Sequence, residues 1–121
     1  MSRHTTPARG AKARADDLFS KIVRSRGACC NCGKTENLQC AHVISRRFAN
    51  TRCDEWNAFC LCARCHHYYT DHPVDWGKFV LEVMGENAYT RLRERSQLTS
   101  KVVWLDVVQR LKLRAKELEL V

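Results

Sequence analysis

Two cysteine pairs are the residues of this sequence whose type and spacing point most directly to chemistry. Cys29 and Cys32 form one CxxC pair, and Cys62 and Cys65 form a second. Two residues between thiolates allow one turn to present both sulfurs to a single ion, and two such turns complete a tetrahedral site with no open position. The sequence therefore predicts a structural Zn²⁺ site of four thiolates, which would join distant parts of a short chain.

The other cysteines are interpreted differently. Cys30 could replace Cys29 as the first ligand, although the spacing favours Cys29. Cys40, Cys53 and Cys60 are expected to be small buried apolar side chains. A redox CxxC usually opens a helix after a strand in a thioredoxin-like pattern, and the presence of two pairs argues against that use.

Histidine and asparagine residues lie between and directly after the two pairs. His42 stands in the run Ala-His-Val-Ile-Ser-Arg-Arg, Asn57 in Trp-Asn, and His66 in Leu-Cys-x-x-Cys-His. In this order, the sequence resembles the HNH (His-Asn-His) nucleases of the ββα-metal class, in the variant with a four-cysteine zinc site. It is similar to small phage and prophage HNH proteins in particular. The resemblance covers about residues 28–72.

The resemblance implies a catalytic set of three residues for the hydrolysis of DNA phosphodiester bonds. His42 matches the family's general base, and a neutral imidazole can accept a proton from water near pH 7. His66 matches the histidine that holds a divalent cation, which would bind the scissile phosphate and the leaving oxygen. Asn57 matches the residue that ties the loop of the motif and orients the base, although it is a metal ligand in some relatives. The family's usual products are a 5′ phosphate and a 3′ hydroxyl.

The position before His42 departs from the family pattern. Many HNH nucleases carry Asp or His there as a second metal ligand, and this sequence has Ala41. His72 is the first candidate for a replacement ligand, and His67 and Asp54 are weaker ones. Because a site with one protein ligand binds metal weakly, activity is expected either to need millimolar Mg²⁺ or to be lost. Mn²⁺, Ni²⁺ and Zn²⁺ also suit a site of one histidine and oxygen ligands.

The charge pattern suits a nucleic-acid partner and is equally well explained by solubility alone. The formal net charge is +8, with both ends of the chain basic, whereas acidic residues outnumber basic ones in residues 53–90. Basic flanks suit a polyanion, and arginine's planar fork suits a phosphate. The arginines expected to contact DNA phosphates are Arg46, Arg47, Arg52 and Arg64. No segment resembles a groove-reading helix, so little sequence specificity is expected.

Hydrophobic periodicity predicts a small α+β fold around these residues. Residues 1–15 lack apolar periodicity and are expected to form a mobile basic arm. The resemblance to HNH nucleases implies a zinc-stabilised core of the ββα-metal, treble-clef-like type over residues 16–85, with flanking helices. The elements expected in it are a helix from Asp16 to Gly27, one or two strands within 37–45, a helical turn over 66–70 and a helix from Pro73 to Gly85.

Residues 86–121 are predicted to form a helical extension of this core. One helix is expected at 87–95, and a long amphipathic helix from Lys101 to about Leu120. The apolar stripe of the long helix recurs at Trp104, Val108, Leu111, Ala115 and Leu118. This stripe suits packing on the domain's own core and packing against a second copy equally well, so the sequence allows a monomer or a homodimer.

Composition excludes other classes of protein. Apolar residues make up 45% of the chain, which suffices for a modest core. No run of about 18 apolar residues is present, so no membrane partner is expected. The opening segment MSRHTTPARG is not followed by the apolar stretch of a signal peptide, and eight cysteines in a reducing compartment favour metal binding over disulfides. We therefore expect a cytoplasmic protein, in a bacterial host if the chain comes from a phage.

The sequence thus predicts a metal-dependent DNA endonuclease. The resemblance suggests phage genome processing, with packaging or recombination proteins as partners. The alternative is a zinc-stabilised DNA-binding module without catalysis, which would have the same fold, charge and zinc. A protein-interaction adaptor is a third interpretation, and it leaves the arginine-rich loop after His42 unexplained except as ordinary surface charge.

Overall fold

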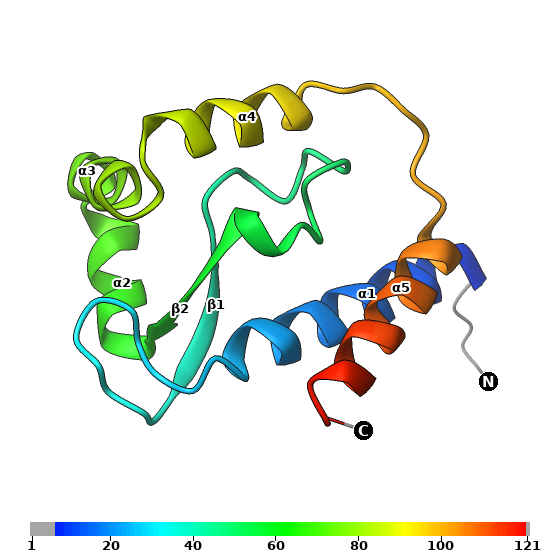
Figure 1. Cartoon of the computed structure of the whole chain (residues 1–121), viewed down its shortest axis with the longest axis horizontal. Helices are drawn as coiled ribbons and strands as arrows, with labels where there is room; N and C mark the ends of the chain where they lie inside the picture. The colour runs from blue at the N-terminus through cyan, green and yellow to red at the C-terminus, as the bar shows by residue number, and fades with distance from the viewer. Residues whose placement is uncertain (1–6, 121) are drawn as a thin grey trace.

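The computed structural model describes residues 7–120, which form a small α+β domain (Figure 1). Its elements are α1 (Pro7–Arg24), β1 (Leu38–His42), β2 (Ala58–Cys62), α2 (Ala63–Asp71), α3 (Pro73–Met84), α4 (Glu86–Ser96) and α5 (Trp104–Glu117). A 3₁₀ turn at Glu55–Asn57 leads into β2. Across residues 7–120, no helix has the length and apolar character that crossing a bilayer requires.

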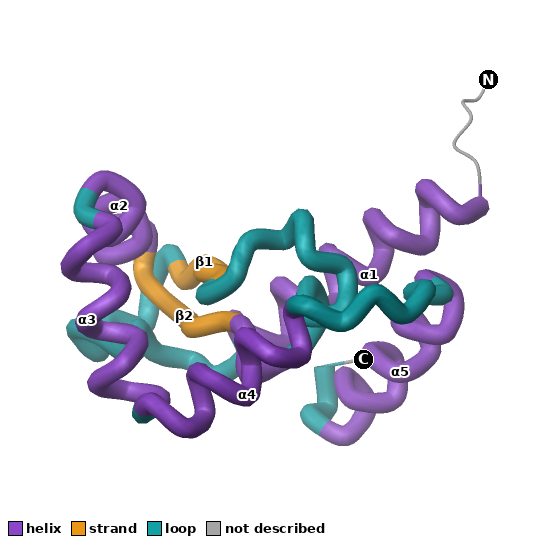
Figure 2. The backbone as a smooth tube through the Cα atoms, turned by 90° about the horizontal axis from the view of Figure 1, so that it is seen from above, coloured by secondary structure: helices purple, strands orange, loops and turns teal. Residues whose placement is uncertain are grey.

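The two strands form an antiparallel sheet that separates two small cores. Cys40 lies opposite Cys60 in this sheet, and alternate residues point to opposite faces. Cys60 belongs to the core that α1 and α5 share, whereas Ala41 and Leu61 belong to a second core beside α2 and α3. Figure 2 shows the strands between these two pairs of helices. β1 thus ends at His42 in a sheet that has helices packed on both faces.

The first helix begins earlier than predicted. α1 starts at Pro7, so most of the expected mobile arm is helical and Asp16 lies inside the helix rather than at its start. Proline is favoured at a first helical position. The apolar residues of the early turns are alanines, and Ala11 and Ala15 are fully buried in the core shared with α5. Because alanine is small, the spacing of large apolar residues did not predict these first turns of the helix. Residues 1–6 lie outside the described residues.

The predicted apolar stripe of the last helix is confirmed. Val108, Leu111 and Ala115 are buried, and Trp104 and Leu118 pack at the margin of the same core. The helix is shorter than expected at both ends. It lies along α1 (Figure 1), so the stripe is used for packing within the chain.

The helices after the second cysteine pair follow their sequence signals. α2 begins directly after Cys62 and is longer than the single turn expected. α3 starts at Pro73 and ends before Gly85, whose φ of +84° is a conformation that glycine adopts at little cost. α4 occupies Glu86–Ser96, close to the predicted range.

Candidate functional site

Four sulfur atoms meet where the loop after α1 approaches the junction of β2 and α2. The Sγ atoms of Cys29, Cys32, Cys62 and Cys65 all lie within 4.8 Å of one another. The Sγ atoms of Cys32 and Cys62 are 3.8 Å apart. Two thiolates bound tetrahedrally at about 2.3 Å from an ion would be separated by roughly the same distance. The four predicted cysteines therefore form one cluster that is able to bind a metal ion.

Tight turns build this cluster. The N–H of Gly33 donates to the carbonyl of Cys29 over 2.8 Å, and Gly33 has a φ of +83° that favours glycine. The N–H of Cys65 donates to the Cys62 sulfur over 3.5 Å. Cys30 is exposed and lies outside the cluster, and its N–H donates to the carbonyl of Cys60. Of the two candidates for the first ligand, the geometry selects Cys29.

The surroundings of the cluster favour thiolates unequally. Burial alone would raise the pKa of Cys29, but hydrogen bonds from the backbone N–H groups of Cys32, Cys62 and Asn31 lower it to about 6. Burial and the neighbouring cysteines raise the pKa of Cys65 to about 12. The protein groups thus stabilise the thiolate of Cys29 and oppose that of Cys65, and a bound cation would favour the ionised form of Cys65.

The remaining cysteines pack as expected. Cys53 and Cys60 are buried in the core between α1 and α5, and Cys40 is half-buried against it. Burial raises the pKa of both Cys40 and Cys53 to about 11, which keeps these thiols protonated and unreactive near neutral pH.

His42 and His66 line one cleft, although they come from different elements. The cleft has a volume of ≈ 660 Å³ and lies between α1, β1 and α2. A smaller pocket of ≈ 90 Å³, bounded by Ala41, is also shared by the two histidines. The polar residues that line the larger cleft are Asp16, Ser20, Arg24, Gln39, His42, Arg46 and His66. The structure therefore brings the two predicted histidines to a single accessible space.

Hydrogen bonding defines the tautomer of His42. Its Nε2 lies 2.9 Å from the carbonyl oxygen of Arg52. A carbonyl can only accept, so Nε2 carries the hydrogen and Nδ1 keeps a lone pair in the neutral ring. Nδ1 makes no hydrogen bond to the described part of the chain. Burial lowers the pKa of His42, with the Arg52 carbonyl opposing this shift, so the ring is neutral near pH 7.

His66 has the opposite arrangement. Its Nδ1 lies 2.7 Å from the side-chain oxygen of Gln39, so Nδ1 carries the hydrogen and Nε2 keeps the lone pair. Burial lowers the pKa of His66. A histidine that binds metal usually donates its other ring N–H to such an acceptor, which orients the ring and fixes the tautomer. Nε2 of His66 is thus suited to bind a cation.

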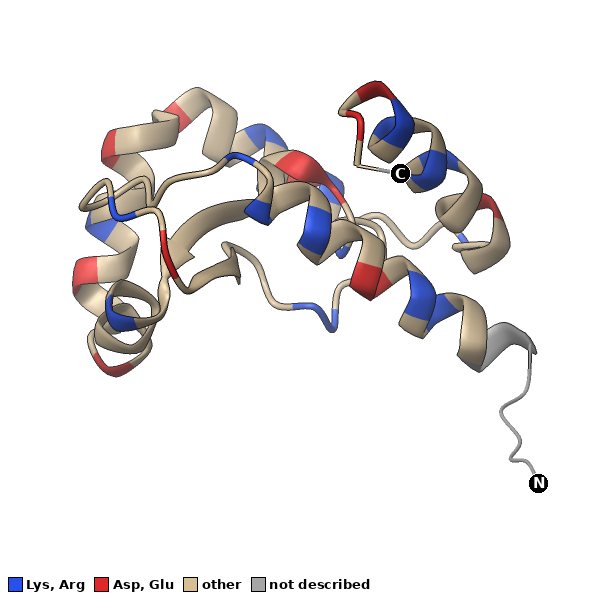
Figure 3. Ribbon diagram, turned by 90° about the horizontal axis from the view of Figure 1, so that it is seen from below, with Lys and Arg blue, Asp and Glu red and all other residues tan. Residues whose placement is uncertain are grey.

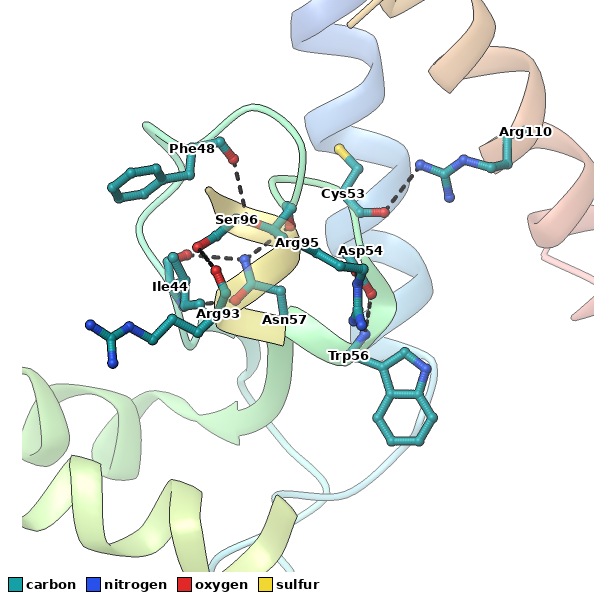
Figure 4. Close-up of polar contacts among 11 residues, drawn as sticks. Ile44, Phe48, Cys53, Asp54, Trp56, Asn57, Arg93, Arg95, Ser96 and Arg110 are labelled. Atoms are coloured by element: carbon teal, nitrogen blue, oxygen red, sulfur yellow. Dashed lines mark hydrogen bonds and ion pairs between the residues drawn. The ribbon is translucent and has the colours of Figure 1, made fainter. Parts of the chain in front are cut away.

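Asn57 ties down the loop that follows His42 (Figure 4). Its side-chain oxygen accepts the N–H of Ile44 over 2.7 Å. Its amide group donates to the carbonyls of Ile44 and Thr51 over 3.0 and 2.9 Å. Asn57 is fully buried, and both its oxygen and its amide hydrogens are engaged with backbone. This geometry is that of an orienting residue and leaves no free atom for a metal ion.

The candidate replacement ligands do not line the cleft. His72 lies at the junction of α2 and α3, where its Nδ1 is 2.7 Å from the carbonyl of Tyr68 and its ring stacks on the Tyr68 ring. Pro73 starts a new helix directly after His72, and His72 is not among the residues that line the cleft with His66, so its role as a ligand stays a prediction. His67 is exposed and pairs with a carboxylate of its own helix, and Asp54 accepts from an arginine of α4. The cleft therefore offers His66 without a second predicted ligand.

Arg52 has a different contact from the one predicted. Its Nε and NH2 groups donate to the two carboxylate oxygens of Asp16 over 2.8 and 2.7 Å, and the Arg52 side chain is only 15% exposed. The guanidinium that was expected to bind phosphate is therefore occupied by a carboxylate of α1.

The other predicted arginines are distributed over the surface. Arg46 lines the cleft, whereas Arg47 lies over the ring of Phe48 and Arg64 lies beside the cysteine cluster. Figure 3 shows further basic residues along α1 and α5 with acidic residues between them. Of the four arginines, Arg46 is the one that lines the cleft of the two histidines.

Sequence reasoning missed several residues of the cleft. Asp16, Ser20 and Arg24 follow one another at intervals of four along α1, and all three line the cleft. This spacing places them on one helix face and was a usable signal. Gln39 had no such signal, because its contact with His66 joins residues far apart in the chain.

No family model matches the chain, and neither does any curated protein or solved structure. A small α+β fold with four cysteines able to bind a metal ion therefore stands on the geometry of this chain alone. The resemblance to HNH nucleases rests on the motif residues, and the activity that it implies is argued next as a proposal.

Proposed function

We propose that the protein is a metal-dependent endonuclease that hydrolyses DNA phosphodiester bonds, built on a ββα-metal core with structural Zn²⁺ on the four cysteines. The order β1, β2, α2, with His42 ending β1 and His66 in the first turn of α2, agrees with this class. Thiolate ligands in tetrahedral geometry favour zinc. The observation that carries the proposal is the pair of complementary imidazoles in one cleft: Nδ1 is free on His42, and Nε2 is free on His66.

The residues of the cleft suit the steps of phosphodiester hydrolysis. His66 would hold a divalent cation such as Mg²⁺ or Mn²⁺ through Nε2, and this cation supplies charge stabilisation at the scissile phosphate and the leaving oxygen. Nδ1 of His42 accepts a proton from the attacking water. The imidazolium that results keeps its Nε2–H on the Arg52 carbonyl. Breakage of the bond to the 3′ oxygen leaves a 5′ phosphate and, after the oxygen takes a proton from solvent, a 3′ hydroxyl.

Charge in the cleft supports a polyanionic substrate without base recognition. Arg24 and Arg46 line the cleft beside the histidines, and the Nε of Arg24 is held by Ser20 over 3.1 Å. Arginines can contact phosphates of any sequence, so affinity should fall steeply as salt rises. We therefore propose little sequence specificity.

Weak binding of the catalytic cation follows from Ala41. Ala41 and Gln39 lie two residues apart and therefore on the same face of β1, and Ala41 lines the small pocket together with His66. A methyl group occupies the place where an acidic residue could provide a second ligand. Among the described residues, the only group of three or more metal-binding side chains is the cysteine cluster. We expect activity to require millimolar Mg²⁺ or Mn²⁺.

The same alanine supports the second candidate function, a zinc-stabilised DNA-binding module without catalysis. In either form, phage genome processing alongside packaging or recombination proteins is the setting that the sequence resemblance suggests. Cleavage distinguishes the two functions, because a binding module has no use for a free imidazole nitrogen beside a metal-binding histidine.

The decisive experiment is the nicking of supercoiled plasmid by the wild type, His42→Ala and His67→Ala with Mg²⁺ or Mn²⁺ added. His67 is the matched control because it is an exposed histidine outside the cleft. We expect the wild type and His67→Ala to nick DNA, and His42→Ala to be slower by about 100-fold or more at equal zinc content. Equal nicking by His42→Ala would show that His42 is not the base. Salt-sensitive binding by all three without cleavage would favour the binding module.

A further inference from the structure

Arg52 connects the flanking helices to the imidazole of His42. Its side chain forms a two-pronged ion pair with Asp16 of α1 and also donates to the carbonyl of Arg46 over 3.0 Å. Its guanidinium carbon lies 5.9 Å from the centre of the Trp104 ring, at the start of α5. The backbone carbonyl of the same residue accepts the hydrogen of His42 Nε2. One residue thus joins α1, α5 and the proposed base.

The carbonyl of Arg52 needs such support because of where it lies. Residues 43–54 contain neither helix nor strand, and isolated turn hydrogen bonds, such as those from the N–H groups of Arg52 and Asp54, hold their backbone. Asn57 holds this loop at Ile44 and Thr51. Arg52 follows the second of these anchors, and its side chain adds contacts with Asp16 and Trp104 to the turn hydrogen bond that its N–H makes with Ala49.

We propose that Asp16 and Trp104 are positioning residues for His42, acting through Arg52. The two neutral tautomers of an imidazole are close in energy, and a fixed acceptor at Nε2 selects the one that leaves Nδ1 free. A two-pronged pair between arginine and a carboxylate defines geometry more strictly than a single contact does, and an aromatic face adds attraction for the cation. The expected effect on cleavage rests on the proposed nuclease function, whereas the effect on the tautomer does not.

This inference assigns a function to parts of the chain outside the HNH motif. Asp16 lies on α1 and Trp104 on α5, and neither helix contributes a residue of the His-Asn-His set. Asp16 also lines the cleft, where a bare carboxylate would repel a phosphate. Because Arg52 pairs with this carboxylate and offsets its charge, Asp16 can lie in a cleft that would bind a polyanion.

The test compares Asp16→Asn with Asp17→Asn, which removes an equal charge from an exposed neighbour on the same helix. The ring nitrogens of His42 are observed by ¹⁵N NMR at a pH where the ring is neutral, and plasmid nicking is measured alongside. We expect a single tautomer with hydrogen on Nε2 in the wild type and in Asp17→Asn. Asp16→Asn should show both tautomers and a kcat lower by about tenfold or more.

Two further variants keep the test decisive. Trp104→Leu should shift the tautomer in the same direction as Asp16→Asn. If Asp16→Asn does not fold, Arg52→Lys replaces it, because lysine keeps the charge but cannot form the two-pronged pair. A folded Asp16→Asn with the wild-type tautomer and kcat would overturn the inference and leave the nuclease proposal intact. If the wild type does not cleave DNA, the nuclease proposal fails, and the tautomer of Asp16→Asn still decides whether Asp16 positions His42.

Discussion

Hydrogen-bond partners make the two histidines of the cleft chemically different. His42 donates from Nε2 to the carbonyl of Arg52, whereas His66 donates from Nδ1 to the side chain of Gln39. Each ring therefore presents a different nitrogen with a free lone pair. A base and a metal ligand can be built from the same residue type in this way, because the acceptor on the far side of the ring fixes the tautomer.

The pH dependence of the proposed nuclease activity follows from these environments. Burial lowers the pKa of both His42 and His66, and both must be neutral to act as base and ligand. Activity should therefore be present at neutral pH and be lost as the pH falls through the lowered pKa values. We expect the nicking rate at fixed Mg²⁺ to rise with pH, with a midpoint below the ordinary histidine value of 6.5. A midpoint above that value in both the wild type and His67→Ala would contradict these assignments.

Gln39 is expected to control metal affinity through His66. Gln39→Leu removes the acceptor that orients the ring, and the loss of such a partner typically weakens metal binding by about 10- to 100-fold. The Mg²⁺ or Mn²⁺ concentration for half-maximal nicking should rise accordingly, whereas Gln39→Glu should keep it low. Gln109→Leu, at an exposed position of α5, is the control. An unchanged metal requirement in Gln39→Leu would mean that His66 does not bind the cation through Nε2.

At the scale of elements, Asn57 joins the loop after β1 to the turn that begins β2. Asn57→Ala would leave the N–H and the carbonyl of Ile44 without partners and would remove one of the two hydrogen bonds that the Thr51 carbonyl accepts. Each group left without a partner costs about 1–3 kcal/mol, so the free energy of unfolding should fall by about 2 kcal/mol or more. Urea denaturation measures this loss. Asn87→Ala on the exposed face of α4 should change little, and a comparable loss in the two variants would refute the orienting role.

Elements with local signals were the ones that the sequence could predict. Pro73 and Gly85 bracket α3, and the stripe that includes Leu111 predicted α5, because each signal lies within its own helix. The start of α1 was missed because its buried residues are alanines such as Ala11, whose burial depends on the close approach of α5.

The candidate site also has features that the sequence could predict and features that it could not. The cysteine spacing predicted a cluster that the structure forms, since each pair is a local turn. The contact of Arg52 with Asp16 could not be read from the sequence, because it depends on α1 lying beside the loop after β1. Partners distant in the chain determine which charged side chain is free and which is engaged.

At the scale of the whole molecule, stability is divided between two unequal cores. The core between α1 and α5 contains large buried side chains such as Phe19, Ile22 and Leu111. Among the described residues, the buried members of the core beside α2 and α3 are Cys29, Ala41, Leu61 and Cys62, and two of these belong to the cysteine cluster. This core has fewer large buried side chains than the first, although the rings of Phe59, Tyr69 and Trp76 pack against it, so a bound ion should contribute part of its stability.

Removal of the metal should therefore affect the two halves of the molecule differently. After treatment with a chelator, we expect amide hydrogen exchange to become fast in β1, β2 and α2, whereas α1 and α5 keep their protection longer because their core contains no ligand. Cys32→Ser should reproduce the effect of the chelator, since it removes one of the four sulfurs. Cys30→Ser should not, because Cys30 is exposed and outside the cluster. Uniform loss of protection along the chain would show instead that the two cores unfold as one unit. His42 packs against Phe19 of the larger core, with their ring centres 5.5 Å apart. In that case the position of His42 would depend on the metal as fully as that of His66 does.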